Sequence, residues 1–534
     1  MYERYVAAGD ALPRRRASRQ FVDRMTSTTT SVAHAATNAN KRGTLIATIV
    51  ASSMTFIDGT VVNVALPALQ RDLGATITDV QWVIEAYALF LGALILVGGS
   101  LGDQLGRRRV FLSGVIVFTI ASVFCGIAPT SLSLIIGRAI QGIGAAFLVP
   151  GSLAIITTTF DDDERGRAMG TWSGFTAIMT AIGPVLGGWL VEHASWRAIF
   201  FMNVPLAVVV VVLSLRSIEE TKDPSRQGAI DWTGAALAVI GLSGIVFGLL
   251  EWPPLGPRHP LVLSTLGIGV AALIGLVVVE GRVTNPMLPL ELFASRCFAP
   301  ANVLTFFLYA ALTVMLFLVP LELIQVQRYT ATAAGGMLLP FPIIMFALSR
   351  WSGGLIRRVG HRLPLTVGPL IAAIGLATFA LPARDTSVVA FTLLAIVILG
   401  IGMAVTVAPL TTTVMESVSS EHSGVASGVN NAVARVAGLI AIAVFGVMVS
   451  VIFGSRATSR LDRLPLTPEA RIEVRAQLPK LAGAEVSTLP SLNPEQKNEV
   501  RAAVDSSFTG AFRAAMLVCA LLAVAAAIVG LKIV

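Results

Sequence analysis

Long apolar runs separated by short charged clusters recur along the sequence and constrain its fold more than any other feature. Each run has about the 20 residues that an α-helix needs to cross the hydrocarbon of a bilayer. Helices are expected there because a spanning segment must satisfy its own backbone hydrogen bonds. The chain is 55% hydrophobic and 13% charged, far less charged than a soluble chain of 534 residues. We therefore predict an all-α polytopic membrane protein.

The apolar runs predict about fourteen transmembrane helices. Their approximate ranges are 44–66, 80–102, 110–128, 131–159, 167–190, 197–215, 231–251, 260–280, 298–325, 332–353, 363–382, 387–413, 424–453 and 508–531. A weak internal repeat relates two six-helix halves, formed by helices one to six and nine to fourteen. It aligns Gly99, Leu101, Asp103, Gly106, Arg107 and Arg108 with Gly353, Leu355, Arg357, Gly360, His361 and Arg362. Related halves with a site between them at midmembrane are a transporter architecture.

The predicted organisation has six parts. A basic cytoplasmic tail (1–43) precedes the N-terminal six-helix half (44–215), and a linker with two additional transmembrane helices follows (216–297). The C-terminal half consists of five helices (298–453), an extracytoplasmic loop (454–507) and a last helix (508–534). Within the loop, residues 468–480 and 494–504 predict short amphipathic helices, so the segment is either a small ordered cap or a flexible loop.

The charge distribution predicts the orientation and excludes one class of partner. The formal net charge is +8, and the excess basic residues lie in the N-terminal tail and in short loops. Lysine and arginine hold loops on the cytoplasmic side, so we expect a multi-pass protein of the cytoplasmic membrane with both termini in the cytoplasm. The same placement argues against a nucleic-acid partner. Three widely spaced cysteines predict no disulfide and no metal site.

Asp58 and Arg138 are ionisable residues inside the first and fourth predicted helices. A charge in hydrocarbon costs on the order of 2.5 to 3.5 kcal/mol even on insertion scales, so each side chain needs a partner or a wet cavity. Along ideal helices, Asp58 lies about 12 Å and Arg138 about 10 Å below the outer ends of their helices. The matching depths predict an ion pair, with either a coupling role or a purely architectural one.

Two further motifs carry structural information. Residues 99–109 read GSLGDQLGRRR, where Gly99 and Gly106 permit a tight turn and Asp103 can pair with Arg107 or Arg108. Residues 183–188 read GPVLGG in the outer half of the fifth predicted helix. There Pro184 bends the helix, and Gly183, Gly187 and Gly188 allow close packing, which predicts a hinge or a seal.

The first of these motifs resembles the signature loop of the major facilitator superfamily. The second resembles the antiporter motif of that superfamily, and residues 195–205 (SWRAIFFMNVP) look like the junction of helices five and six in its fourteen-span drug:proton antiporters. The stretch 56–67 likewise resembles the first-helix motif of that family, with Asp58 at the acidic position. From residue 41 onward the resemblance covers nearly the whole chain.

The resemblance implies a major facilitator fold with two six-helix halves and two linker helices. It implies proton-driven export of amphipathic, often cationic, compounds by alternating access, with Asp58 and Arg138 in proton coupling. The proton gradient would supply the energy, and no cofactor is expected. The expected partners are membrane lipids, protons and a small amphipathic substrate, with an envelope partner on residues 454–507 left open; a monomer is expected.

Four positions depart from the family pattern or add buried charge. Glu85 replaces a usual small polar residue, and Glu322 stands where an aromatic residue is usual. Arg357 replaces, in the second copy of the loop, the acid that is Asp103 in the first. Arg435 is a further charge inside the thirteenth predicted helix, and it needs some partner. Glu85, Glu322 and Arg435 are therefore candidates for the lining of a substrate cavity.

Several functions remain as alternatives or are excluded. A lipid or glycolipid exporter of the same fold stays open, and so does a non-transporting receptor or scaffold. No G-x-x-x-x-G-K-[ST] segment is present, which excludes ATP hydrolysis by a P-loop. Residues 98–102 spell G-x-S-x-G, but they end a membrane helix and lack the strand-turn-helix context of a nucleophile elbow. No catalytic constellation is visible, so an enzyme is not expected.

Overall fold

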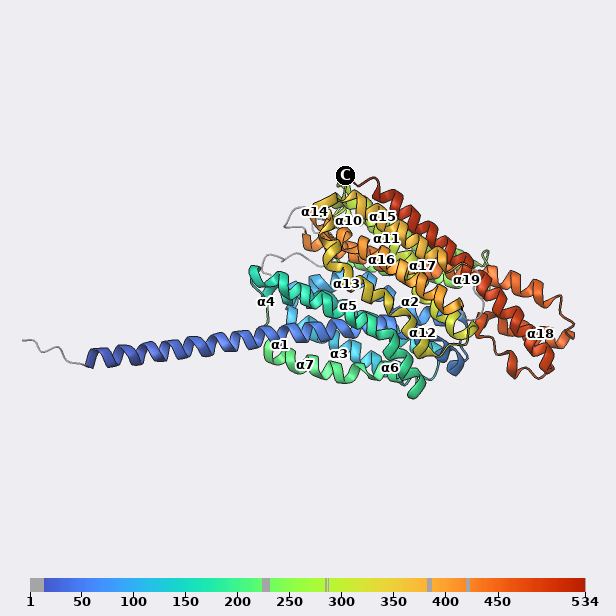
Figure 1. Ribbon diagram of the computed structural model, residues 1–534, viewed down its shortest axis with the longest axis horizontal. Coiled ribbons are helices and arrows are strands. Elements are labelled where there is room, and N and C mark those ends of the chain that lie inside the picture. The colour runs from blue at the N-terminus through green and yellow to red at the C-terminus, as the bar shows by residue number, and fades with distance from the viewer. Residues whose placement is uncertain are drawn as a thin grey trace, which may run out of the picture.

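The computed structural model describes residues 14–222, 231–283, 286, 288–381, 387–418 and 423–533, and all regular structure in these residues is helical (Figure 1). Thirteen helices in the described part of the chain are long and apolar enough to cross a membrane, and Arg362–Thr378 is a shorter apolar helix. This arrangement confirms the predicted all-α class with about fourteen spans.

The N-terminal half contains α1 (Arg14–Leu73), α2 (Ile77–Leu105), α3 (Arg107–Gly126), α4 (Ser131–Thr159), α5 (Asp162–His193), α6 (Ala198–Phe201) and α7 (Asn203–Ser217). Local sequence fixes several of these ends. Thr76 and Asp79 form a capping box that begins α2, and Thr130 and Ser133 form one that begins α4. The first part of α1 projects out of the bundle as a single helix (Figure 1).

The linker contributes α8 (Trp232–Leu250), the short α9 (Trp252–Leu255) and α10 (Pro260–Glu280). The C-terminal half contains α11 (Phe298–Leu321), α12 (Ala331–Leu338), α13 (Pro340–Gly353), α14 (Leu355–Val359), α15 (Arg362–Thr378), α16 (Ser387–Glu416), α17 (Ser423–Leu461), α18 (Pro468–Gln477) and α19 (Pro494–Gly530). One π-helical turn, Glu322–Val326, continues α11.

Several helices differ from their predicted ranges, and the first of them, α1, begins at Arg14 instead of residue 44. The range 332–353 is two helices, α12 and α13, which meet at Leu339 because Pro340 has no backbone N–H to continue the first. The last helix begins at Pro494, so the predicted short helix 494–504 is its first part. Asn493 and Gln496 cap this start. Because α17 also runs on to Leu461, the connection between the last two helices shortens to residues 462–493, which we call the cap.

The bundle has two distinct ends. We call the end from which α1 projects the tail end, and the end that carries α18 the cap end (Figure 1). The cap is ordered, and it joins both halves. Gln70 of α1 donates a hydrogen bond to the Lys480 carbonyl (3.2 Å), and Gln325 beside α11 donates one to the Gln70 side chain (2.8 Å). Arg501 of α19 donates to the carbonyls of Ala482 and Ala484.

Candidate functional site

The buried ion pair expected from the sequence lies between α1 and α4. Arg138 donates through one terminal guanidinium nitrogen to Asp58 Oδ2 at 2.5 Å. Its Nε donates to the carbonyl of Val83 on α2 at 3.0 Å. Asp58 and Arg138 are each only 1% exposed. The predicted contact is therefore present, and three helices of the N-terminal half enclose it.

Gln141 is a third member of this network, and the sequence reasoning missed it. Its side-chain nitrogen donates to Asp58 Oδ1 at 2.9 Å, and its oxygen accepts from Arg138 at 2.7 Å. Each carboxylate oxygen of Asp58 thus has its own donor. Gln141 lies three residues after Arg138, on the same face of α4, so its spacing was the available signal. The network is a closed triangle of one acid, one base and one amide.

Aromatic rings complete the surroundings of Arg138. The guanidinium carbon lies 4.3 Å from the ring centre of Tyr87 and 5.9 Å from that of Phe200. A cation over an aromatic face gains about 0.5 to 2 kcal/mol, and more where water is excluded. The Tyr87 hydroxyl donates to the carbonyl of Thr55 on α1. Arg138 is therefore held by contacts other than Asp58, so loss of the acid would not by itself release it.

Gly183, Gly187 and Gly188 of the predicted seal are all buried, and they allow α5 to approach two other helices. A Cβ at Gly187 would lie 2.5 Å from Val61 of α1, and one at Gly188 would lie 2.5 Å from the carbonyl oxygen of Ala331 on α12. Glu192 accepts a hydrogen bond from the backbone N–H of Thr332 at 2.7 Å. Because α5 and α12 belong to different halves, the motif lies where the halves close at the cap end.

The loop between α2 and α3 forms the predicted charge network at the tail end. Arg107 donates two hydrogen bonds to Asp103, at 2.8 and 2.9 Å. Gly106 has φ of +121°, and a Cβ there would lie 2.6 Å from the carboxylate of Glu220, which accepts from the backbone N–H of Arg108. A glycine is therefore required at position 106, both because of the positive φ and because a Cβ would collide with Glu220. Pro150 of α4 is the nearest neighbour of Gly99.

A second ion-pair cluster at the tail end ties α1 to α5. Lys41 contacts Asp161 at 2.9 Å and Glu164 at 2.7 Å. The hydrogen bond from the Lys41 ammonium holds the pKa of Asp161 below its usual value. Together with the Arg107 network, this cluster places most of the paired surface charge of the N-terminal half at one end of the bundle.

The three other predicted cavity residues occupy separate places. Glu85 on α2 is completely buried, and neither of its carboxylate oxygens has a hydrogen-bond partner among the described residues. Arg435 on α17 lies against Gly92 of α2, across the contact between the halves. Glu322 lies at the end of α11, in a pocket formed by the C-terminal half. The structure does not bring these three residues together with Asp58 in one cluster.

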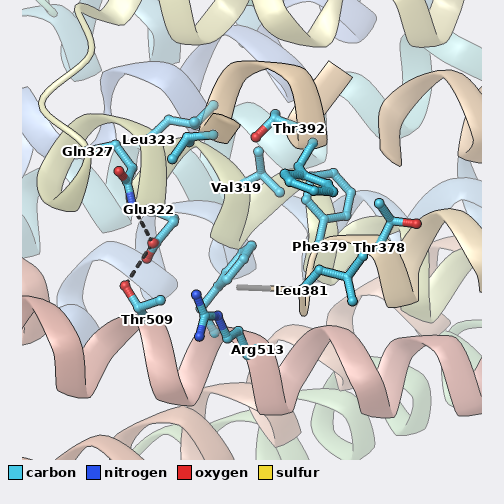
Figure 2. Close-up of a pocket in the computed structure, with 13 residues that line it drawn as sticks. Val319, Glu322, Leu323, Gln327, Thr378, Phe379, Leu381, Thr392, Thr509 and Arg513 are labelled. Carbon is cyan, nitrogen blue, oxygen red and sulfur yellow. Dashed lines mark hydrogen bonds between the residues drawn. The ribbon is translucent and has the colours of Figure 1, made fainter. Parts of the chain in front are cut away.

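The pocket around Glu322 is partly open, and its space of about 500 Å³ includes solvent at its mouth (Figure 2). It is lined by residues of α11, α15, α16 and α19 and of the turns beside them: Val319, Glu322, Leu323, Gln327, Thr378, Phe379, Leu381, Val388, Phe391, Thr392, Thr509, Phe512 and Arg513. Glu322 Oε1 accepts hydrogen bonds from Gln327 (3.1 Å) and Thr509 (2.8 Å). All of these residues belong to the C-terminal half, so the pocket is distinct from the contact between the halves.

No group of three His, Cys, Asp or Glu side chains in the described residues has an arrangement that could hold a metal ion. The Asp58 network instead offers one proton-accepting carboxylate beside a fixed cation. Protonation of Asp58 would cancel its attraction to Arg138 while leaving the other hydrogen bonds of the arginine in place.

Comparisons with known proteins agree with this architecture. Residues 48–442 match the family described as the Major Facilitator Superfamily. The chain is 34% identical over 432 residues to the multidrug resistance protein Stp of Mycobacterium tuberculosis, covering 80% of this chain and 79% of that protein. It is 32% identical over 493 residues to the tetracenomycin C resistance and export protein of Streptomyces glaucescens, covering 91% and 90% of the two chains.

Solved structures show the same fold at low identity. The crystal structure of a bacterial homologue of the human lysosomal transporter Spinster, in an inward-facing and unoccupied conformation, has a TM-score of 0.64 at 18% identity. That similarity covers 92% of this chain and 98% of the other. The match to the superfamily and the relatives of 30% identity or more define a membrane transporter rather than an enzyme. The chain belongs to the Major Facilitator Superfamily, as its loop motifs predicted.

Proposed function

We propose that this protein is a proton-coupled antiporter that exports hydrophobic or amphipathic compounds, cationic ones among them, across the cytoplasmic membrane. The observation that carries the proposal is the fully buried Asp58–Arg138–Gln141 network in the N-terminal half. Export of drugs is supported by relatives named for multidrug resistance and for tetracenomycin C resistance and export. The motif at α5 supports alternating access.

In this proposal, the structure corresponds to a conformation closed at the cap end. The approach of Gly188 to Ala331 and the hydrogen bond between Thr332 and Glu192 join the halves there. Gln325 also donates directly to Gln70 of the other half, and the cap joins the halves through its contacts with Gln70 and Arg501. The orientation predicted from basic residues puts the tail end in the cytoplasm, so the conformation would face inward.

The ion pair then corresponds to the state after proton release. We take the contact between Arg138 and Asp58 to be an ion pair with an ionised carboxylate. Exposure of the network from the cap side would let Asp58 take a proton, which removes the attraction to Arg138. Removing the charge of one partner from a buried ion pair costs about 3–5 kcal/mol. A free-energy difference of roughly 5.5 kcal/mol moves a two-state equilibrium from 1:99 to 99:1, so the two energies are of similar size. One proton is therefore enough to bias the choice between inward and outward conformations.

Transport in cells tests the proposal. The protein would be expressed in a bacterial strain that lacks its main drug exporters, and efflux of a fluorescent cation such as ethidium would be followed with and without an uncoupler. We expect expression to speed efflux and to raise dye and biocide resistance, and the uncoupler to abolish both effects. Efflux that persists when the proton gradient has collapsed would contradict proton coupling. A change in outer-leaflet lipid without any drug phenotype would favour a lipid exporter.

A further inference from the structure

The pocket around Glu322 contains two opposite charges, Glu322 and Arg513, which attract each other but form no direct ion pair. Glu322 is 6% exposed, and its Oε2 has no hydrogen-bond partner among the described residues. Arg513 lines the same pocket and makes no hydrogen bond or ion pair in the described part of the chain. The neighbouring charges of α19 are already paired, because Asp505 contacts Arg501 at 2.9 Å and Arg328 at 3.4 Å. A buried carboxylate oxygen without a partner is costly, and the Arg513 guanidinium makes no hydrogen bond to it, so a ligand that brings its own donor would satisfy it.

The other wall of the pocket is apolar. Phe379 and Phe512 form an edge-to-face pair with ring centres 6.3 Å apart, and Phe391 and Val388 continue this wall. Figure 2 shows Phe379 on one side of the pocket and Glu322, Thr509 and Gln327 on the other. A ligand that fills the pocket must therefore combine a charged polar part with an apolar part.

The position of Arg513 matches the depth of lipid headgroups. Seventeen residues separate it from Gly530 at the other end of α19, which is about 26 Å along an ideal helix, against about 30 Å for the hydrocarbon core. The helices that form the pocket also present large apolar side chains outward, among them Ile374, Leu394 and Leu517. The pocket thus lies at the lipid-facing side of the C-terminal half, near one boundary of the bilayer.

We infer that this pocket binds a zwitterionic membrane lipid whose headgroup carries a primary ammonium and a phosphate. The ammonium donates to the free oxygen of Glu322, the phosphate contacts Arg513, and the start of an acyl chain packs against the phenylalanine rings. A cation alone would meet repulsion from Arg513, and an anion alone would meet repulsion from Glu322. A headgroup with both charges satisfies both side chains at once. The inference does not depend on the proposed proton coupling.

Lipid binding to the purified full-length protein tests this inference. After delipidation in detergent, native mass spectrometry would measure the apparent dissociation constants of short-chain phosphatidylethanolamine and phosphatidylglycerol. We expect the ethanolamine lipid to bind about tenfold more tightly, and Glu322→Gln and Arg513→Gln each to remove about tenfold of that affinity. Glu499→Gln removes an exposed carboxylate from the same helix, and we expect it to change nothing.

Further measurements distinguish a lipid site from sites for other ligands. Equal binding of the two lipids, or unchanged binding in Glu322→Gln, would overturn the inference. If tetraphenylphosphonium bound through Glu322 and bound more tightly in Arg513→Gln, the site would be a simple cation site, which also overturns it. Free phosphoethanolamine that competed as strongly as the lipid would show that only the headgroup is recognised. Where a charge variant fails to fold, Thr509→Val removes only the hydroxyl that orients Glu322, with an expected loss of about threefold.

Discussion

Replacement of Asp58 by asparagine removes the negative charge of the buried network. The substitution keeps the size and planar shape of the side chain, and it leaves Arg138 as a charge that is 1% exposed and has no acid beside it. Arg138 keeps its hydrogen bonds to Val83 and Gln141 and its contact with the Tyr87 ring. The loss therefore combines the attraction between two charges with one hydrogen bond, because the asparagine NH2 group cannot accept from Arg138 or Gln141 as a carboxylate oxygen does.

The size of this loss follows from the geometry. Two unit charges about 4 Å apart attract by about 4 kcal/mol at an effective dielectric constant of 20. We expect Asp58→Asn to lower the free energy of unfolding by about 3 kcal/mol, and Arg138→Gln to lower it by a similar amount. The double variant contains no unpaired buried charge, so it should recover most of the loss and give a coupling energy of at least about 2 kcal/mol.

Equilibrium unfolding of purified protein in mixed micelles, with increasing denaturant, measures these differences. Asp161→Asn serves as the matched control, because it removes an exposed carboxylate from a pair at the tail end and should change stability by less than about 1 kcal/mol. If the losses in the free energy of unfolding simply added in the double variant, the two charges would not stabilise one another. The same result would remove the physical basis for Asp58 as a proton-controlled switch.

Three other changes test separate parts of the structure. Gly188→Ala places a Cβ 2.5 Å from the Ala331 carbonyl, so it should keep the cap end from closing and slow export at least about tenfold. Gly336→Ala is the control, because the space around its Cβ is open and export rates should stay unchanged. Gln141→Leu removes a donor from Asp58 and an acceptor from Arg138, and it should cost about 1–3 kcal/mol in the same unfolding assay; a stability equal to that of the wild type would exclude Gln141 from the network. Glu85→Gln removes no hydrogen bond, so we expect unfolding within about 0.5 kcal/mol of the wild type, and a loss as large as that of Asp58→Asn would reveal a partner for Glu85.

Much of the fold could be predicted from the sequence because the lipid bilayer restricts which sequences can cross it. A helix that crosses hydrocarbon must be apolar along about 20 residues, and that length is visible in the chain. The ends of helices that continue beyond the bilayer were harder to predict, because their polar residues resemble those of a loop. The start of α19 shows this difficulty. Pro494 was read as part of a separate short helix, although Asn493, Pro494 and Gln496 form a regular helix start.

The site was partly predictable for a related reason. Asp58 and Arg138 are charges in hydrocarbon, and their similar depths were enough to predict contact. Gln141 carries no charge, so its presence in a membrane helix demands no particular partner, and its role depends on how α1 and α4 are rotated about their axes. Glu322 presented the opposite difficulty. Its charge was conspicuous in the sequence, but only the packing of α11 against α15, α16 and α19 places it in a pocket of its own.

Proton movement during export tests the central claim most directly. Purified protein would be reconstituted into proteoliposomes with a pH-sensitive dye trapped inside, and export of a cationic dye would be started by an imposed pH gradient. We predict that the wild type moves protons opposite to the dye in a fixed ratio, and that Asp58→Asn loses this coupled proton flux. Coupled proton and dye movement that persists in Asp58→Asn would contradict the account.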